Sequence, residues 1–203
     1  ITHRYPEDRI FAEEDGLRSP ISEGSVWVID PIDGTNNFVT QKEDFAVMVA
    51  YFEDGIGQFG LIYDVMRDHL FYGGGEFPVY RNEVELTPFV DQPLENFLIA
   101  SNVGMLEKND WGMADLGMDS LGIRVYGSAG ISFSKILSGG ILAYFSYIWP
   151  WDYAAAAIMG EQLGYTVLNL NGDKPNYQSV EPIMMVPKVK LTEIQTYLKK
   201  GRS

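Results

Sequence analysis

The stretch VWVIDPIDGTNNF, residues 26–38, decides the fold because an apolar run leads directly into a turn that carries two carboxylates. The run Val26–Ile29 contains β-branched and aromatic residues, which predicts a buried strand. The proline of the stretch lacks a backbone donor and is expected to stop the pairing ladder, while Gly34 permits a bend into a helix. Asp30 and Asp33 are therefore expected at the edge of a sheet.

The turn combines ligands for a cation with donors for an anion. Asp30 and Asp33 offer the oxygen ligands that hard divalent cations such as Mg2+ select, and the N–H groups of Gly34, Thr35 and Asn36 can point at a phosphate. Two aspartates three residues apart are also common as simple turn caps. The choice between these interpretations depends on the rest of the chain.

Three motifs occur in a specific order along the chain. Residues 11–16 read Phe-Ala-Glu-Glu-Asp-Gly, residues 30–35 read Asp-Pro-Ile-Asp-Gly-Thr, and residues 151–155 read Trp-Asp-Tyr-Ala-Ala. Together they resemble the inositol monophosphatase family of Mg2+-dependent, Li+-sensitive sugar phosphatases, with Ala12 where that family usually has Gly. The resemblance implies a layered α/β/α/β/α sandwich, whereas the sequence pattern alone predicts a mixed α/β or α+β domain.

The resemblance implies a cluster of Mg2+ ions. One ion would be bound by Glu13, Asp30 and the carbonyl oxygen of Ile32, a second by Asp30, Asp33 and Asp152, and a weaker third by Glu13 with waters. Mn2+ is an expected substitute, and Li+ and Ca2+ are expected inhibitors. Taken alone, Glu13 is also typical of a solvated acidic loop, and Asp152 of a helix cap.

Catalysis is expected to depend on Glu13, Asp30 and Thr35. The resemblance implies that the Thr35 hydroxyl orients the attacking water and that Gly34 and Thr35 hold the phosphate group. In the family this threonine pairs with an aspartate from two N-terminal helices. Asp8 is too close to Glu13 in the sequence to be that residue. The chain is therefore interpreted as a fragment without those helices, and whether it activates water alone stays open.

Substrate contacts are expected from Asp33, Asp152 and a turn of small residues formed by Gly127, Ser128 and Ala129. This turn resembles the family's Gly-Ser/Thr-Ala turn beside the substrate sugar. Close packing of the following helix is an equally open explanation for the small residues.

The segment before the Trp-Asp motif bears on specificity. Inositol-selective members carry a Glu there that bonds a ring hydroxyl, but residues 143–150 read AYFSYIWP and contain no acid. Tyr144 and Phe145 are expected in the core, as aromatics at strand spacing usually are. Tyr147 and Trp149 are the candidates for an aromatic wall facing the ligand.

Composition narrows the class of protein. Of 203 residues, 46% are hydrophobic and 21% charged, which is typical of a globular protein with a substantial core. A formal net charge of −13 argues against binding nucleic acid or an anionic membrane, which needs basic surfaces. It does not argue against a phosphate substrate, because bound cations reverse the local charge.

There is no cysteine, and only His3 and His69 offer imidazole, so a metal site must use oxygen ligands. No apolar run of membrane-spanning length and no secretory leader are recognised, so a cytoplasmic location is expected.

Two subdomains are expected, residues 1–94 and residues 95–203. The first should hold the metal and phosphate motif, an antiparallel meander over residues 44–74 and a hairpin at residues 79–88. The second should alternate strands and helices. Its expected strands are residues 97–100, 121–125 and 141–148, and its expected helices follow residues 127–130, span residues 153–164 and span residues 191–200.

The leading hypothesis is a homodimeric, Mg2+-dependent phosphomonoesterase for inositol monophosphate or a related small sugar or polyol phosphate. An alternative keeps this chemistry and changes the substrate to fructose 1,6-bisphosphate or a nucleotide phosphate such as NADP. A third hypothesis is a regulatory binding module without catalysis. The intact motif residues disfavour it, because loss of activity would be expected to remove ligands.

Overall fold

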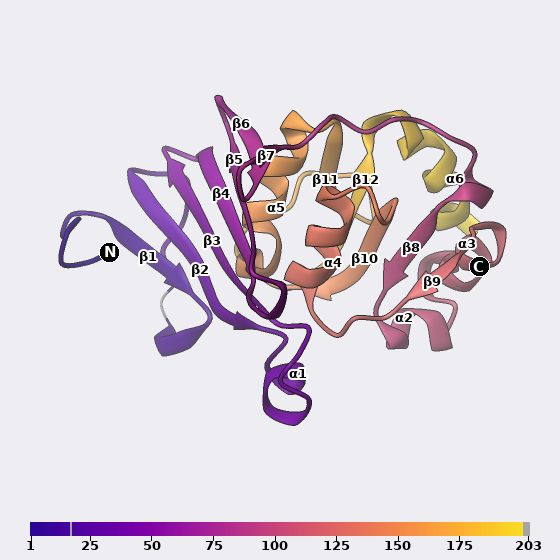
Figure 1. Cartoon of the computed structure of the whole chain (residues 1–203), viewed down its shortest axis with the longest axis horizontal. Coiled ribbons are helices and arrows are strands. Elements are labelled where there is room, and N and C mark those ends of the chain that lie inside the picture. Colours follow the sequence, from indigo (N-terminus) through magenta and orange to yellow (C-terminus); the bar gives the residue numbers. More distant parts are fainter. Residues whose placement is uncertain (17, 201–203) are drawn as a thin grey trace.

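The computed structural model describes residues 1–16 and 18–200, without the side chains of Asp15, Lys199 and Lys200. Within these residues two β-sheets face each other across a pair of helices (Figure 1). The first sheet contains, in spatial order, β1 (Arg9–Ala12), β2 (Ser25–Asp33), β3 (Ala46–Glu53), β4 (Ile56–Asp64), β5 (His69–Gly74), β6 (Phe77–Arg81) and β7 (Val84–Glu85).

The first sheet confirms the predicted meander and hairpin. β3, β4 and β5 pair in antiparallel order, and β6 and β7 form the additional hairpin. Asn82 lies in the turn of this hairpin with a φ of 54°, a left-handed conformation that Asn tolerates better than most residues. β1 is the exception, because it pairs with β2 in parallel.

The second sheet contains both parallel and antiparallel strand pairs and lies nearer the C-terminus. Its strands run β11 (Tyr165–Asn169), β12 (Glu181–Pro187), β10 (Ala143–Ile148), β8 (Leu98–Ser101) and β9 (Gly122–Arg124). β10 pairs with β8 in parallel and with β12 in antiparallel fashion. The three predicted strands are present as β8, β9 and β10, whereas β11 and β12 were not predicted.

The helices account for the rest of the regular structure in the described residues. The α-helices are α1 (Thr35–Thr40), α2 (Val103–Glu107), α3 (Met113–Asp119), α4 (Ala129–Leu137), α5 (Pro150–Gln162) and α6 (Leu191–Lys200). The short 3-10 helices are η1 (Glu14–Gly16), η2 (Val65–Arg67), η3 (Leu94–Asn96), η4 (Asp110–Gly112) and η5 (Lys188–Lys190). No helix in residues 1–16 and 18–200 is both long and apolar enough to span a membrane.

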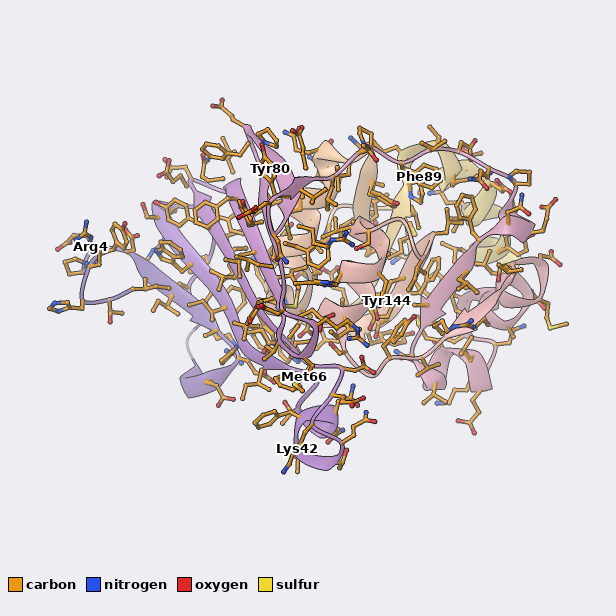
Figure 2. All side chains as sticks on the ribbon, viewed as in Figure 1. Arg4, Lys42, Met66, Tyr80, Phe89 and Tyr144 are labelled. Atoms are coloured by element: carbon orange, nitrogen blue, oxygen red, sulfur yellow. The ribbon has the colours of Figure 1, made fainter. Side chains whose placement is uncertain are left out.

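The layers follow from which faces are apolar. α4 and α5 lie between the two sheets, and α3 and α6 lie on the far side of the second sheet (Figure 1). One hydrophobic cluster fills the space between the first sheet, α4, α5 and β10, and a second lies beneath α3 and α6. Figure 2 shows Tyr144 in the interior between the sheets. The layered α/β class is thus confirmed, with no helix of the described residues covering the outer face of the first sheet.

Contact between α5 and the first sheet is unusually close. A Cβ atom at Gly60 of β4 would lie 2.3 Å from the carbonyl oxygen of Ala155 in α5, so only glycine fits there. This packing fixes α5 over β4. It therefore also fixes the N-terminal turn of α5 relative to the end of β2.

The proposed division at residue 94 stays a prediction. All strands of the first sheet precede this residue and all strands of the second sheet follow it. The larger hydrophobic cluster, however, contains residues from both parts of the chain, including Val28 and Ile131.

Candidate metal-binding active site

The end of β2 brings two aspartates to the same face of the first sheet. In a regular strand, residues three positions apart point to opposite faces. Here the pairing of β2 with β3 shifts between Asp30 and Asp33, which inserts one extra residue into β2. Both carboxyl groups are consequently buried, at 1% and 7% relative exposure. Pro31 was expected to stop the ladder, and this is corrected: pairing resumes at Asp33 after the bulge.

The first turn of α5 adds a third carboxylate. One oxygen from each of Asp30, Asp33 and Asp152 lies within 4.8 Å of the others. The backbone N–H of Trp149 donates to Asp152 Oδ2 at 2.7 Å, so Asp152 also caps the helix as its position in the sequence suggested. Capping and membership of the acidic cluster are thus compatible.

The N-terminus of α4 holds Asp33 in place. The Ser128 hydroxyl donates to Asp33 Oδ2, and the backbone N–H groups of Ala129 and Gly130 donate to the same carboxylate at 3.2 and 2.8 Å. A carboxylate at the start of a helix is favoured by the helix dipole and by the unpaired N–H groups there.

The negative charges of the three acids are not balanced by ion pairs among the described side chains. Burial, followed by the charge of Asp33, raises the pKa of Asp30 to about 9 and that of Asp152 to about 7. A side-chain hydrogen bond between these two acids further raises the pKa of Asp30 and lowers that of Asp152. Burial also raises the pKa of Asp33, although the Ser128 hydroxyl and the two N–H groups oppose it. None of the ion pairs between described side chains involves these three acids. Buried carboxylates without a basic partner fit divalent cations with oxygen ligands.

Glu13 borders the cluster without joining the group defined by the 4.8 Å separation. Its backbone N–H donates to the carbonyl oxygen of Ile29 at 3.3 Å, which places it beside the end of β2. Its side chain is exposed, and its charge contributes to the raised pKa of Asp30, Asp33 and Asp152. Three of the four predicted carboxylate ligands therefore converge, and the fourth lies next to them.

Comparison with known proteins identifies the family. The family model described as "Inositol monophosphatase family" matches residues 1–201. The chain belongs to the inositol monophosphatase family. It is 37% identical over 179 residues to the inositol-1-monophosphatase of Bacillus subtilis, covering 85% of this chain and 68% of that protein. It is 28% identical over 185 residues to human inositol monophosphatase 2, covering 85% of this chain and 64% of that protein. The chain thus spans about two thirds of the length of these curated relatives.

Solved structures of the inositol monophosphatase family show the same fold. SaIMPase-II with inositol monophosphate is 31% identical, with a TM-score of 0.90 over 98% of this chain and 80% of that chain. SaIMPase-II with 2'AMP is 32% identical, with a TM-score of 0.92 over 98% and 79%. An IMPase/NADP phosphatase with Mg2+ and phosphate is 25% identical, with a TM-score of 0.88 over 97% and 75%.

The turn that was predicted to bind phosphate directly follows β2 and begins α1. Gly34 has a φ of 83°, and a Cβ atom there would lie 2.9 Å from the Cβ of Ser128. Glycine is therefore required where the turn meets α4. The Thr35 hydroxyl donates to the carbonyl oxygen of Ile32 at 3.1 Å. Phosphate binding by Gly34 and Thr35, water orientation by Thr35 and cation binding by Ile32 stay predictions.

The predicted substrate turn of this inositol monophosphatase family member packs against the cluster. Ser128 is buried and its hydroxyl is engaged with Asp33, and Ala129 donates to the same group. Beside them, Asn37 donates to the carbonyl oxygens of Tyr126 and Asp44 at 2.7 and 2.9 Å. The bond to Tyr126 joins α1 to the loop before α4, and the bond to Asp44 joins α1 to the loop before β3.

Gly127 lies in this joint, with a φ of 71°, and a Cβ atom there would lie 3.1 Å from the amide group of Asn37. Direct contacts of Gly127, Ser128 and Ala129 with a substrate stay predictions.

The aromatic residues of β10 divide between two faces of the sheet. Tyr144 and Phe145 are core residues, as predicted. The Tyr147 hydroxyl donates to Asp110 at 2.7 Å and accepts from the indole N–H of Trp111 at 3.3 Å, so this side chain lies against η4. Trp149 is 37% exposed beside Asp152 and is the remaining candidate for a wall that faces a ligand.

Two residues near the cluster were missed by sequence reasoning. Tyr144 was assigned only to the core, yet the charges of Asp33 and Asp152 add to burial in raising the pKa of its phenol. Arg18 packs over the rings of Trp149 and Trp151. The only sequence signal for Arg18 was a basic residue soon after the acidic run at residues 13–15.

Proposed function

We propose that this chain carries the active site of a Mg2+-dependent phosphomonoesterase for inositol monophosphate or a related small sugar or polyol phosphate. The observation that supports this most is the convergence of the buried Asp30 and Asp33 carboxylates and the half-buried Asp152 carboxylate within 4.8 Å. Such a group binds hard divalent cations, and Mg2+ in proteins commonly joins carboxylates to substrate phosphate. Membership of the family gives the reaction class.

The proposed role of each residue follows from its position in the site. Asp30, Asp33 and Asp152 would hold the cations, with Glu13 and the carbonyl oxygen of Ile32 as further ligands. Mg2+ supplies, when bound, the Lewis acidity that activates a water nucleophile and stabilises the leaving oxygen.

The remaining groups would act on the substrate and the water. The backbone N–H groups of Gly34 and Thr35 would hold the phosphate group, and the Thr35 hydroxyl would orient the water. The water oxygen forms a bond to phosphorus as the bond between phosphorus and the alcohol oxygen breaks, and that oxygen takes up a proton.

A nucleotide phosphate or fructose 1,6-bisphosphate is the second candidate substrate. Residues 143–150 contain no acid to bond an inositol hydroxyl, and exposed Trp149 offers an aromatic face. One related structure contains 2'AMP and another protein of this fold is described as an IMPase/NADP phosphatase. The remaining parts of the proposal are Mn2+ as a substitute, Li+ and Ca2+ as inhibitors, a homodimer and a cytoplasmic location.

Phosphate release by the purified chain tests the proposal. Activity on inositol monophosphate should require Mg2+ and disappear with a chelator. Absence of activity on every phosphate monoester at saturating Mg2+, together with a correctly folded protein, would favour the regulatory binding module instead.

A further inference from the structure

Arg18 lies where the segment that carries Glu13 meets the start of α5. Its backbone forms an isolated antiparallel bridge with Phe11. Its Nη1 donates to the carbonyl oxygen of Ala12 at 2.5 Å. These two contacts hold Arg18 against Phe11 and Ala12, and Glu13 directly follows Ala12. The segment of residues 11–16 is called the Glu13 loop below.

The same guanidinium packs on two aromatic rings at the start of α5, one from the N-cap residue Trp149 and one from Trp151 within the helix. Arg18 Cζ lies 4.4 Å from the ring centroid of Trp151 and 5.5 Å from that of Trp149. The two indoles stack on each other with centroids 4.8 Å apart and planes 9° apart. A planar guanidinium over an indole face is favourable by cation–π attraction and stacking. Asp152 follows Trp151 directly, so one side chain joins the Glu13 loop to the turn that carries Asp152.

Glu13 is the predicted cation ligand that the fold holds least firmly. It is exposed and lies outside the 4.8 Å group, whereas Asp33 and Asp152 each accept bonds that fix their carboxylates. Among the described contacts, Glu13 is held by the hydrogen bond from its backbone N–H to the carbonyl oxygen of Ile29. Its approach to the cluster therefore depends on how the loop is attached to its neighbours.

We propose that Arg18 is a positioning residue, which clamps the Glu13 loop onto the Trp149–Trp151 stack and thereby sets the distance of Glu13 from the cluster. The inference rests on the proposed function, since it takes the cluster to be a cation site. Arg18 acts through Glu13 and not by contact with the substrate. Lysine would keep the charge but lose the planar group that both stacks and donates to Ala12.

Titration of the chain with Mn2+, followed by electron paramagnetic resonance, tests this without measuring activity. Arg18→Ala should weaken Mn2+ binding about tenfold, the lower end of what loss of an outer support of a metal ligand typically causes. Arg18→Lys should weaken Mn2+ binding to a similar degree. Arg4→Ala, which removes an exposed arginine from the N-terminal turn, is the matched control and should bind Mn2+ as the wild type does. Circular dichroism confirms that each variant is folded.

A double-mutant cycle with Glu13→Gln shows whether the two residues act as one unit. The Glu13→Gln/Arg18→Ala variant should bind Mn2+ no more weakly than Glu13→Gln alone. Additive losses, or full recovery with Arg18→Lys, would overturn the positioning role. Wild-type affinity in Arg18→Ala would also overturn it. Failure of the wild-type chain to bind any Mn2+ would instead contradict the proposed function, so the two failures are distinguishable.

Discussion

The hydroxyl group of Ser128 donates a hydrogen bond to the carboxylate of Asp33 although 95 positions separate them in the sequence. The bond ties the N-terminus of α4 to the end of β2, and the N–H groups of Ala129 and Gly130 complete the attachment. The turn of small residues therefore supports an acid of the cluster, whatever else it contacts.

Ser128→Ala is expected to weaken activation by Mg2+ about tenfold, because an outer partner of a cation ligand is lost. The folded state should lose about 1–3 kcal/mol, since a buried acceptor keeps its desolvation cost without the bond. Ser128→Thr, which keeps the hydroxyl, should recover most of both effects. Mg2+ titrations of activity and denaturant unfolding measure the two quantities.

Ser138→Ala is the matched control for this prediction, because Ser138 lies just after the other end of α4 and its hydroxyl donates to the Ser134 carbonyl oxygen at 2.8 Å. It should leave the Mg2+ requirement unchanged. If Ser128→Ala also left it unchanged, the hydrogen bond to Asp33 would have no role in cation binding.

The metal-free protein is expected to lose stability as pH rises above about 4. Burial raises the folded-state pKa of Asp152 to about 7 and that of Asp30 to about 9, from ordinary values of 3.8. Below about pH 3.8 both acids are protonated in the folded and in the unfolded state, so their contribution to the free energy of unfolding is fully present. As pH rises the unfolded chain releases protons first, and the contribution is lost through the folded-state pKa values.

Denaturant midpoints in a chelator between about pH 6 and 9 measure this loss. Added Mg2+ should reverse it, because cation binding displaces the protons and is stronger at higher pH. Asp30→Asn should flatten the pH dependence in the chelator. A chelated wild-type protein that became more stable across this range would contradict the assignment of raised pKa values.

Asp30→Asn should abolish detectable turnover. Asp30 is the most buried acid of the cluster, and the proposed cation set uses it twice, so its replacement weakens more than one ion. Thr35→Ala should lower kcat with little change in the Mg2+ concentration needed, because its hydroxyl is proposed to orient the water. Metal titrations of both variants separate the two roles. Near-normal activity of Asp30→Asn at ordinary Mg2+ would exclude a bridging role.

Local patterns predicted the elements around the site but not how they meet. The strand, the turn and α1 followed from residues 26–38, and the start of α5 followed from Pro150 and the alanines after it. The bulge that puts Asp30 and Asp33 on one face depends on pairing with β3, which strand alternation in β2 alone does not reveal. The nearness of Asp152 was inferred only from a resemblance of motifs.

Contacts between segments that are distant in the sequence explain why Arg18 was not predicted near the site and why Tyr147 was predicted on the wrong side. Arg18 meets Trp151 only because β1 pairs in parallel with β2 and α5 lies over β4. Such contacts depend on tertiary packing, which periodicity does not report. Tyr147 was placed on the ligand side by its position near the end of β10, but its hydroxyl is bound by η4, a segment with no recognisable motif.

The last prediction concerns substrate choice. A site that hydrogen-bonds one particular hydroxyl rejects analogues without it by about 10^4-fold or more, because its own polar group is left unpaired, whereas apolar contacts discriminate by about 10 to 200-fold. Residues 143–150 contain no acid, and the hydroxyl of Tyr147 is already engaged with Asp110. Values of kcat/KM for inositol monophosphate, fructose 1,6-bisphosphate and a nucleotide 2'-phosphate should therefore lie within about a few hundred-fold of each other. Trp149→Ala should lower kcat/KM for the nucleotide more than for the other two substrates, because loss of the stack that holds Arg18 affects all three, whereas loss of a stacking face affects only the nucleotide base. Tyr147→Phe is the matched aromatic control and should leave the three ratios unchanged. A preference for inositol monophosphate above about 10^4-fold in the wild type would mean that another side chain supplies the hydroxyl contact, and the aromatic wall would not set specificity.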